Sequence, residues 1–200
     1  MKKTKQIENN AKIVNKFLNS KLNGNPKKLY DAAGHLIVNG GKRLRPYMVI
    51  KSCQILGGKS SNAMIAASAV EMVHNFTLVH DDIMDNASLR RGVKTVHEKW
   101  SNNIAILSGD ALLVKSYQML FNLASEIRQL AIEKFSNAAI IVCEGQQMDM
   151  DFEKDNSISI QDYLIMIEKK TSALFASSFD LSLIYKLTYR APNFSFKLSF

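Results

Sequence analysis

A chain of 200 residues, 46% of them hydrophobic, is long enough to form one domain with a sizeable core. Its net charge of +8 lies at the two ends, because residues 1–31 carry eight lysines against two acidic residues and residues 186–200 add three basic residues and no acidic one. No zinc-ligand spacing or RNA-binding signature supports nucleic acid as a partner, and no apolar run reaches the roughly 18 residues of a membrane span. The basic N-terminus is therefore interpreted as a solvated lysine-rich helix, with nucleic acid or membrane contact as the alternative.

The apolar pattern along the chain predicts helices joined by short breaks, without a convincing alternating strand. The breaks fall at glycines, prolines and small polar residues. We expect helices over residues 4–22, 26–38, 46–56, 61–85, 94–100, 103–124, 127–153 and 159–184. Cys53 and Cys143 lie in apolar helical contexts and are interpreted as buried thiols, which favours a cytoplasmic protein. The predicted fold class is all-α, in one domain.

Three carboxylates stand close together at the end of the helix predicted over 61–85. Asp81 and Asp85 are four residues apart and share one helical face, with Asp82 one step round. Such a group repels itself unless a cation offsets the charge, and Mg²⁺ binds one or two carboxylates together with water and phosphate oxygens. The alternative is an exposed helix end whose acids pair with Arg90 and Arg91 in the following loop.

The same helix carries a largely polar stripe on an otherwise apolar surface. Its members follow one another at steps of three and four residues: Glu71, His74, Leu78, Asp81 and Asp85. A helix that is apolar nearly all round, with one polar stripe, suits the wall of a polar cavity inside a helical bundle.

Basic residues precede the third predicted helix in the stretch GGKRLRP. Lys42, Arg43 and Arg45 follow two glycines and lead into a helix N-terminus at Pro46. Glycines permit close approach of the backbone, a helix N-terminus favours anions, and lysine and arginine bind phosphate oxygens. The stretch therefore indicates a phosphate site, with a basic surface loop as the alternative.

Two later segments add polar residues at helical spacing. In EGQQMDMDFE, Gln146 and Asp149 share a helical face that Glu153 extends, although a solvated acidic helix end has the same pattern. In EKKTSALFASS, Lys170 and Thr171 precede a run of small residues. Together the segments describe an acidic metal site and two separate basic phosphate sites among apolar helices. The ligand they predict is a diphosphate with an apolar tail.

The motifs GGKRLRP, EMVH…LVHDDIMDNASLRRG, GDALL, EGQQMDMDFE and KKTSALFA, in this order, resemble those of the trans-polyprenyl diphosphate synthases. This family includes the geranyl, farnesyl and geranylgeranyl diphosphate synthases, and the resemblance covers roughly residues 25–182. It implies an isoprenoid-synthase-type helical bundle around a central cavity, Mg²⁺ as the cofactor, and a homodimer. It also implies a prenyltransferase that condenses isopentenyl diphosphate with an allylic diphosphate to give a short-chain trans-prenyl diphosphate.

The resemblance further implies roles for individual residues. The catalytic residues would be Asp81, Asp82, Asp85 and Lys170, and the metal ligands would be Asp81, Asp85 and Asp149. The residues near the allylic diphosphate would be Arg90, Lys170 and Thr171, and Gln146, which matches the family's Gly-Gln-x-x-Asp motif, would also bind substrate. The residues that bind isopentenyl diphosphate would be Lys42, Arg45, His74 and Arg91.

In the family, bulky residues just before the acidic motif form the floor of the pocket for the prenyl tail. Here Phe76 stands five residues before Asp81 and Thr77 stands four before it. One aromatic at the fifth position resembles the archaeal-type geranylgeranyl diphosphate synthases. The expected main product is therefore a C20 diphosphate, with C15 next, although Phe76 could also be an ordinary core aromatic.

The sequence departs from the family pattern near its C-terminus. The family carries a second aspartate-rich motif after the Lys-Thr helix; none is found here, and residues 185–200 match none of the family's motifs. We expect residues 1–184 to form the N-terminal part of one prenyl synthase domain, incomplete at its C-terminal end. Residues 185–200 are expected to form a tail, either disordered or compact in another way. Apolar faces of the helices over 103–124 and 159–184 should then be exposed.

Three functions are compatible with these features. An active prenyltransferase is favoured by the intact first acidic motif. A regulatory subunit that pairs with a complete synthase, or a fragment without catalytic activity, is favoured by the lack of the second motif, which normally holds a further Mg²⁺.

Overall fold

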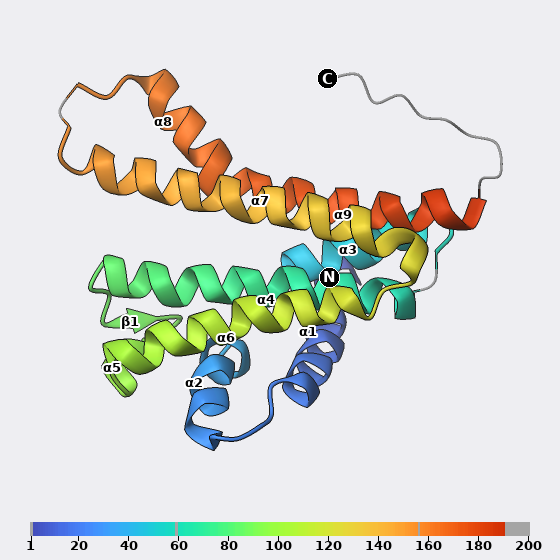
Figure 1. The fold of residues 1–200 in the computed structure, drawn as a ribbon, viewed down its shortest axis with the longest axis horizontal. Coiled ribbons are helices and arrows are strands. Elements are labelled where there is room, and N and C mark those ends of the chain that lie inside the picture. Colours follow the sequence, from blue (N-terminus) through green and yellow to red (C-terminus); the bar gives the residue numbers. More distant parts are fainter. Residues whose placement is uncertain (1, 59, 156, 191–200) are drawn as a thin grey trace.

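The computed structural model describes residues 2–58, 60–155 and 157–190, and Figure 1 shows their arrangement. The helices in chain order are α1 (Lys2–Lys21), α2 (Lys27–Val38), α3 (Leu44–Ile55), α4 (Ser60–Met84), α5 (Val96–Lys99), α6 (Asn102–Phe121), α7 (Ser125–Phe152), α8 (Ile160–Ile167), η1 (Glu168–Ser172) and α9 (Ala173–Arg190). All eight predicted helices are present, and the last is divided into α8, the π-helical turn η1 and α9. The prediction of an all-α fold is confirmed.

The expectation that the chain contains no strand is wrong for a short hairpin after α4. β1 (Leu89–Arg90) and β2 (Val93–Lys94) pair in antiparallel fashion. The two residues between them, Arg91 and Gly92, have φ angles of 56° and 78°, as in two-residue turns whose central residues are both left-handed. Strands of two residues are too short to show an alternating pattern, so periodicity could not reveal them.

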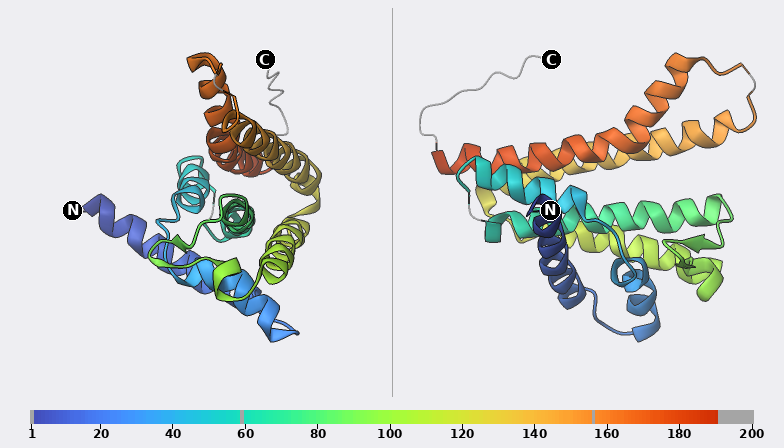
Figure 2. Two further views of the ribbon diagram at one scale, coloured as in Figure 1. Left: turned by 90° about the vertical axis from the view of Figure 1, so that its left-hand side faces the viewer. Right: turned by 180° about the vertical axis from the view of Figure 1, so that it is seen from behind.

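α4 lies at the centre of the bundle, with α3, α6 and the pair formed by α7 and α9 around it (Figure 2). Its first half is rich in small side chains, and Ala66, Ala67, Ala69 and Val70 are fully buried. Because the distance between packed helices depends on the side chains at their contact, these residues let the neighbours approach α4 closely. The second half of α4, which carries the acidic motif, is thereby held among its neighbours.

Large apolar side chains are exposed on the two faces where the sequence predicted exposure. They are Ile106, Leu107, Val114 and Phe121 on α6, and Ile160, Tyr163, Leu164 and Phe179 on α8 and α9. Among the described residues, α6 alone is long and apolar enough to cross a membrane, and 39% of its most apolar window is buried inside the protein. Core helices of bundles share that length and composition, so α6 is weak evidence for a membrane span.

Two further expectations have mixed outcomes. Cys53 is buried as predicted, but Cys143 is exposed, because it lies on a face of α7 that lines an open cavity. Residues 185–190, assigned from the sequence to the tail, continue α9 as helix. The remainder of the predicted tail, residues 191–200, lies outside the described residues.

Candidate active site

A cavity of about 290 Å³ lies between α4, α7 and the segment formed by η1 and α9, with one wall residue from α3. Eight residues that the sequence predicted for the site line it: Arg45, His74, Phe76, Thr77, Asp81, Gln146, Lys170 and Thr171. Apolar side chains, among them Leu78, Met150 and Leu174, form much of the remaining wall. The cavity therefore combines charged groups with apolar surface, as expected for a ligand with a charged head and an apolar tail.

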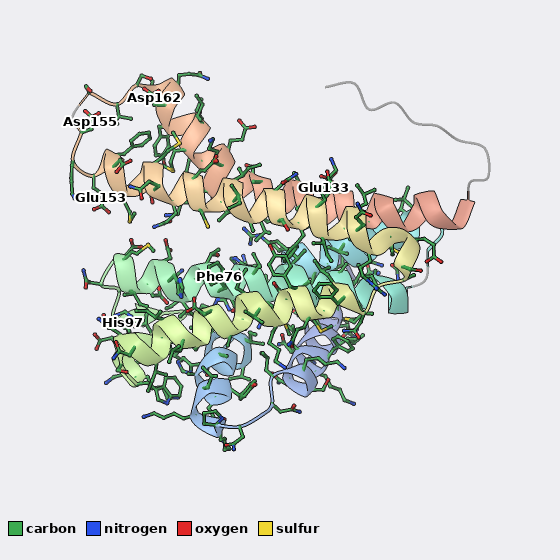
Figure 3. The ribbon with its side chains drawn as sticks, in the orientation of Figure 1. Phe76, His97, Glu133, Glu153, Asp155 and Asp162 are labelled. Atoms are coloured by element: carbon green, nitrogen blue, oxygen red, sulfur yellow. The ribbon has the colours of Figure 1, made fainter. Side chains whose placement is uncertain are left out.

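Arg90 holds the acidic end of α4. The hairpin returns its guanidinium to this helix, where Nε donates to Asp82 Oδ1 at 2.5 Å and Nη2 donates to Asp81 Oδ2 at 3.3 Å. Burial raises the pKa of the Asp82 carboxyl group, and Arg90 opposes that shift. The pairing with arginine is thus real, but Asp82 is fully buried and Asp81 is half-buried, so this is not an exposed helix end. His97, labelled in Figure 3, lies near the acidic end of α4.

Lys170 joins the acidic residues of two helices. Its Nζ donates to Asp149 Oδ2 on α7 and lies 3.3 Å from Asp81 Oδ1 on α4. Burial lowers the pKa of Lys170, but the hydrogen bond to Asp149 and the charge of Asp81 outweigh burial and raise it overall. The ammonium group therefore remains charged between the two carboxylates.

The predicted metal ligands lie around this lysine. Asp85, which directly follows the last residue of α4, is more exposed than Asp81 and Asp82; partial burial followed by the charge of Asp81 raises its pKa, with Lys170 opposing. Within residues 2–58, 60–155 and 157–190, no three His, Cys, Asp or Glu side chains are grouped so that they could hold a metal by themselves. Asp81 Oδ1 is buried, and the ammonium group of Lys170 lies 3.3 Å from it. Asp149 is bonded to Lys170.

The basic side of the cavity is formed by Arg45. Its Nη1 lies 3.3 Å from His74 Nε2, and its guanidinium carbon lies 4.2 Å from the centroid of the Phe175 ring. Burial, followed by the charge of Arg45, lowers the pKa of His74 well below its usual value. His74 is therefore neutral and can accept a hydrogen bond from Arg45, which orients the guanidinium toward the cavity.

Arg43 and Glu71 do not face the cavity. Glu71 was expected on the polar stripe of α4, but it is buried and its Oε1 lies 2.8 Å from Nη1 of Arg43, with the side chains 2% and 1% exposed. Arg43 also donates from Nε to Asn15 Oδ1 at 2.6 Å and from Nη2 to the carbonyl of Ile37. The middle cation of GGKRLRP thus joins α1, α2 and α4 in the core, because only a carboxylate on a neighbouring helix can offset a buried guanidinium.

Arg91 supports the glycine-rich loop before α3. Its Nη1 donates to the carbonyls of Leu36 at 3.0 Å and Gly40 at 2.6 Å. A Cβ atom on Gly41 would lie 2.1 Å from Nη1 of Arg43 and 2.7 Å from Nη1 of Arg91. Arg91 thus lies against the loop that carries Lys42, and Lys42 itself is exposed and does not line the cavity.

Two residues that contact the lining of the cavity were not predicted from the sequence. Phe175, whose ring stacks on Arg45, stood inside a quoted motif but showed no signal beyond its aromatic ring. Gly109 of α6 packs against His80, since a Cβ there would lie 2.3 Å from His80 Nε2. A glycine inside a helical pattern is a sign of such close packing and could have revealed it.

Comparison with known proteins gives one consistent result. The polyprenyl synthetase family model matches residues 26–192. The geranylgeranyl diphosphate synthase of Sulfolobus acidocaldarius is 46% identical over 169 residues, which are 82% of this chain and 51% of that protein. The geranylgeranyl diphosphate synthase of Saccharolobus solfataricus is 44% identical over 177 residues, which are 86% of this chain and 52% of that protein. The chain thus spans about half the length of the curated relatives it matches.

Solved structures show the same likeness. The geranylgeranyl pyrophosphate synthetase of Geoglobus acetivorans superposes with a TM-score of 0.86 at 42% identity, over 89% of this chain and 59% of that one. The geranylgeranyl pyrophosphate synthetase of Pyrococcus horikoshii Ot3 superposes with a TM-score of 0.87 at 38% identity, over 90% of this chain and 56% of that one.

Proposed function

Since the chain belongs to the polyprenyl synthetase family, we propose that it binds an allylic diphosphate and isopentenyl diphosphate and joins them into a longer trans-prenyl diphosphate. The observation that carries this proposal is the meeting of Asp81 and Lys170, from different helices, in a cavity that is otherwise largely apolar. The charged groups suit a metal-bound diphosphate, and the apolar wall suits a prenyl chain. Because the chain spans about half of its relatives, the activity of the whole protein is part of the proposal.

The allylic diphosphate is assigned to the end of the cavity at Asp81. Lys170, Thr171 and Gln146 line that end, and Arg90 contacts Asp81 from the hairpin. A lysine and an arginine placed there bind the negative charge that grows on the diphosphate as it leaves.

Isopentenyl diphosphate is assigned to the basic side of the cavity. Arg45 supplies a guanidinium that His74 orients, and Arg91 holds the loop that carries Lys42. In this arrangement Arg45 and His74 bind the diphosphate from the cavity, Lys42 binds it from the loop, and Arg91 binds it from the turn of the hairpin.

The aspartates fit Mg²⁺. Asp81 and Asp85 supply carboxylate oxygens one helical turn apart, since the N–H of Asp85 donates to the carbonyl of Asp81. Mg²⁺ needs only one or two carboxylates besides water and substrate oxygens. Asp81, Asp85 and Asp149 would hold the ion. When bound, it would offset negative charge on the diphosphate and favour departure of that group.

The reaction joins the two substrates at the apolar part of the cavity. Departure of the diphosphate leaves an allylic carbocation, the double bond of isopentenyl diphosphate attacks it, and loss of a proton completes the trans product. Arg90 and Lys170 bind the departing diphosphate, while apolar residues such as Leu78 and Leu174 keep water from the cation.

Phe76 is assigned as the residue that ends the prenyl tail, with Thr77 beside it. Phe76 lines the cavity in the middle of α4, where Figure 3 labels it, and its ring packs edge-on against His80 with centroids 4.7 Å apart. Val73 and Ala69, one and two turns behind it, are fully buried. A C20 product is proposed ahead of C15 because one aromatic five residues before Asp81 resembles the archaeal-type geranylgeranyl diphosphate synthases. We further propose a homodimer, which the family resemblance implies, and a cytoplasmic location, which the interpretation of Cys53 and Cys143 as thiols favours.

The proposal is tested by isothermal titration calorimetry of this chain with geranyl diphosphate and Mg²⁺. Asp81→Ala should abolish Mg²⁺-dependent binding and leave the helical circular dichroism spectrum nearly unchanged. Asp151→Ala is the matched control, because Asp151 is exposed on α7 and does not line the cavity. Unchanged affinity in Asp81→Ala would rule out the assignment. If this chain has no turnover alone but changes the turnover of an added full-length synthase relative to that synthase alone, the result would instead favour a regulatory subunit.

A further inference from the structure

Gly145 lies well inside α7, where glycine is unfavourable for helix formation relative to alanine. A Cβ atom built on it would lie 2.3 Å from the backbone nitrogen of Lys170 and 2.7 Å from Cα of Lys170 and the carbonyl carbon of Lys169. Real Cβ contacts essentially never fall below 3.0 Å, and these atoms are all backbone, so no side-chain rotation can make room. Only glycine fits this point of α7 without displacing the neighbouring segment.

The segment that Gly145 contacts is η1, a five-residue π-helical turn over Glu168–Ser172. π-helical turns are rare, occur mostly as single turns, and are frequent at functional sites. The missing side chain and the irregular turn occur at the same contact between α7 and η1. The glycine therefore accommodates the one turn that carries the predicted Lys-Thr pair.

Two ion pairs flank this contact. Lys169 Nζ lies 2.7 Å from Glu144 Oε2, and Lys170 Nζ is bonded to Asp149 Oδ2. Glu144 and Asp149 lie on α7 on the two sides of Gly145 in the sequence. Adjacent lysines of η1 are thus tied to α7, one on either side of the backbone contact.

We propose that Gly145 is a positioning residue that acts through Lys170. Because Gly145 has no side chain, the η1 backbone packs directly against α7. This packing determines the distance of 3.3 Å between Lys170 Nζ and Asp81 Oδ1 on α4. A side chain at position 145 pushes η1 away from α7 and carries Lys170 with it. This inference rests on the proposed function only where it assigns Lys170 to the diphosphate; the packing of η1 on α7 stands independently.

The first test is a double-mutant cycle that measures binding of inorganic diphosphate with Mg²⁺ by calorimetry. Gly145→Ala should weaken binding by about 10- to 100-fold, the value of a hydrogen bond to a charged group. Lys170→Met should weaken it similarly, and the double variant should lie within about twofold of Lys170→Met, because Gly145 acts through that lysine. Losses that multiply in the double variant would overturn the proposal. Gly34→Ala is the matched control, since a Cβ on this helical glycine meets nothing within 4 Å.

The second test is hydrogen exchange over residues 168–172, which needs no ligand. Exchange should accelerate in Gly145→Ala and stay unchanged in Gly34→Ala. If the wild-type chain binds no diphosphate, the proposed function fails while exchange still decides the role of Gly145. If Gly145→Ala does not fold, Glu144→Gln decides instead: it should accelerate exchange in η1 and weaken binding by up to about fivefold, as for a partly exposed ion pair. Unchanged exchange over residues 168–172 in Gly145→Ala, or in Glu144→Gln where Gly145→Ala does not fold, would overturn the proposal.

Discussion

Arg43→Met should strongly destabilise the fold, because it removes a buried cation from the centre of a polar network. The Glu71 carboxylate keeps the amide of Asn75, whose Nδ2 lies 3.1 Å from Glu71 Oε1, but loses its cation. The side-chain oxygen of Asn15 and the carbonyl of Ile37 lose their donor as well. Breaking a buried pair by removing one partner costs about 3–5 kcal/mol.

For a domain of this size, about 1 kcal/mol shifts Tm by roughly 2–4 °C, so Arg43→Met should lower Tm by about 6–20 °C. The assay is urea and thermal unfolding followed by far-UV circular dichroism. Lys27→Met is the matched control, because its pair with Asp31 is exposed, with side chains 83% and 49% accessible, and is worth at most about 1 kcal/mol.

Two further results test the physical reason. Burial raises the pKa of Glu71, and Arg43 opposes this shift. Without Arg43 the folded-state pKa rises further above the unfolded value of about 4.3, so the stability of Arg43→Met should be greatest below that value and fall as pH rises through the folded pKa. Arg43→Met combined with Glu71→Leu should recover much of the loss. If Arg43→Met costs no more than Lys27→Met, the network does not stabilise the fold as argued.

The remaining predictions concern the cavity. In an active enzyme made of residues 26–190 of this chain and the C-terminal half of the Saccharolobus solfataricus relative, Phe76→Ala should give longer products by chromatography after dephosphorylation; an unchanged length distribution would make Phe76 core packing. In the same enzyme, Arg90→Gln should weaken the allylic substrate most and Arg91→Gln isopentenyl diphosphate most, as measured by calorimetry, whereas equal losses would contradict divided sites. Burial lowers the pKa of His74 well below its usual value, so as pH falls the unfolded state binds a proton at His74 before the folded state does. The free energy of unfolding should therefore be highest above about pH 6.5 and fall below it, by at most about 1.4 kcal/mol per pH unit. His74→Gln should flatten that slope in urea unfolding, and an equal slope in both proteins would show that His74 is not responsible.

The helices and the acidic face could be predicted from the sequence because both depend on local spacing. Apolar residues at helical period mark α4. Asp85 lies one residue beyond the end of α4, but its N–H still donates to the carbonyl of Asp81, so the four-residue step keeps the two residues one turn apart. The hairpin at Leu89–Lys94 was not predicted, because its strands of two residues are shorter than any repeating pattern.

The roles of the three cations in GGKRLRP were decided by the tertiary structure alone. By charge and spacing Lys42, Arg43 and Arg45 are alike, yet one is exposed, one is in the core and one lines the cavity. The left-handed backbone of Arg43, with φ of 51°, turns it toward Glu71, which lies 28 residues away in the sequence. A buried cation needs a carboxylate from a neighbouring element, and only helix packing determines which cation meets one.

The same reasoning applies to Lys170. The sequence places it in a Lys-Thr pair, but its contacts with Asp149 and Asp81 exist because α7 admits the π-helical turn at Gly145 and because α4 lies opposite. Local patterns therefore determined which residues carry charge and which helical face they share. The distances between charges on different helices were determined by close packing of side chains and backbone, which no local pattern records.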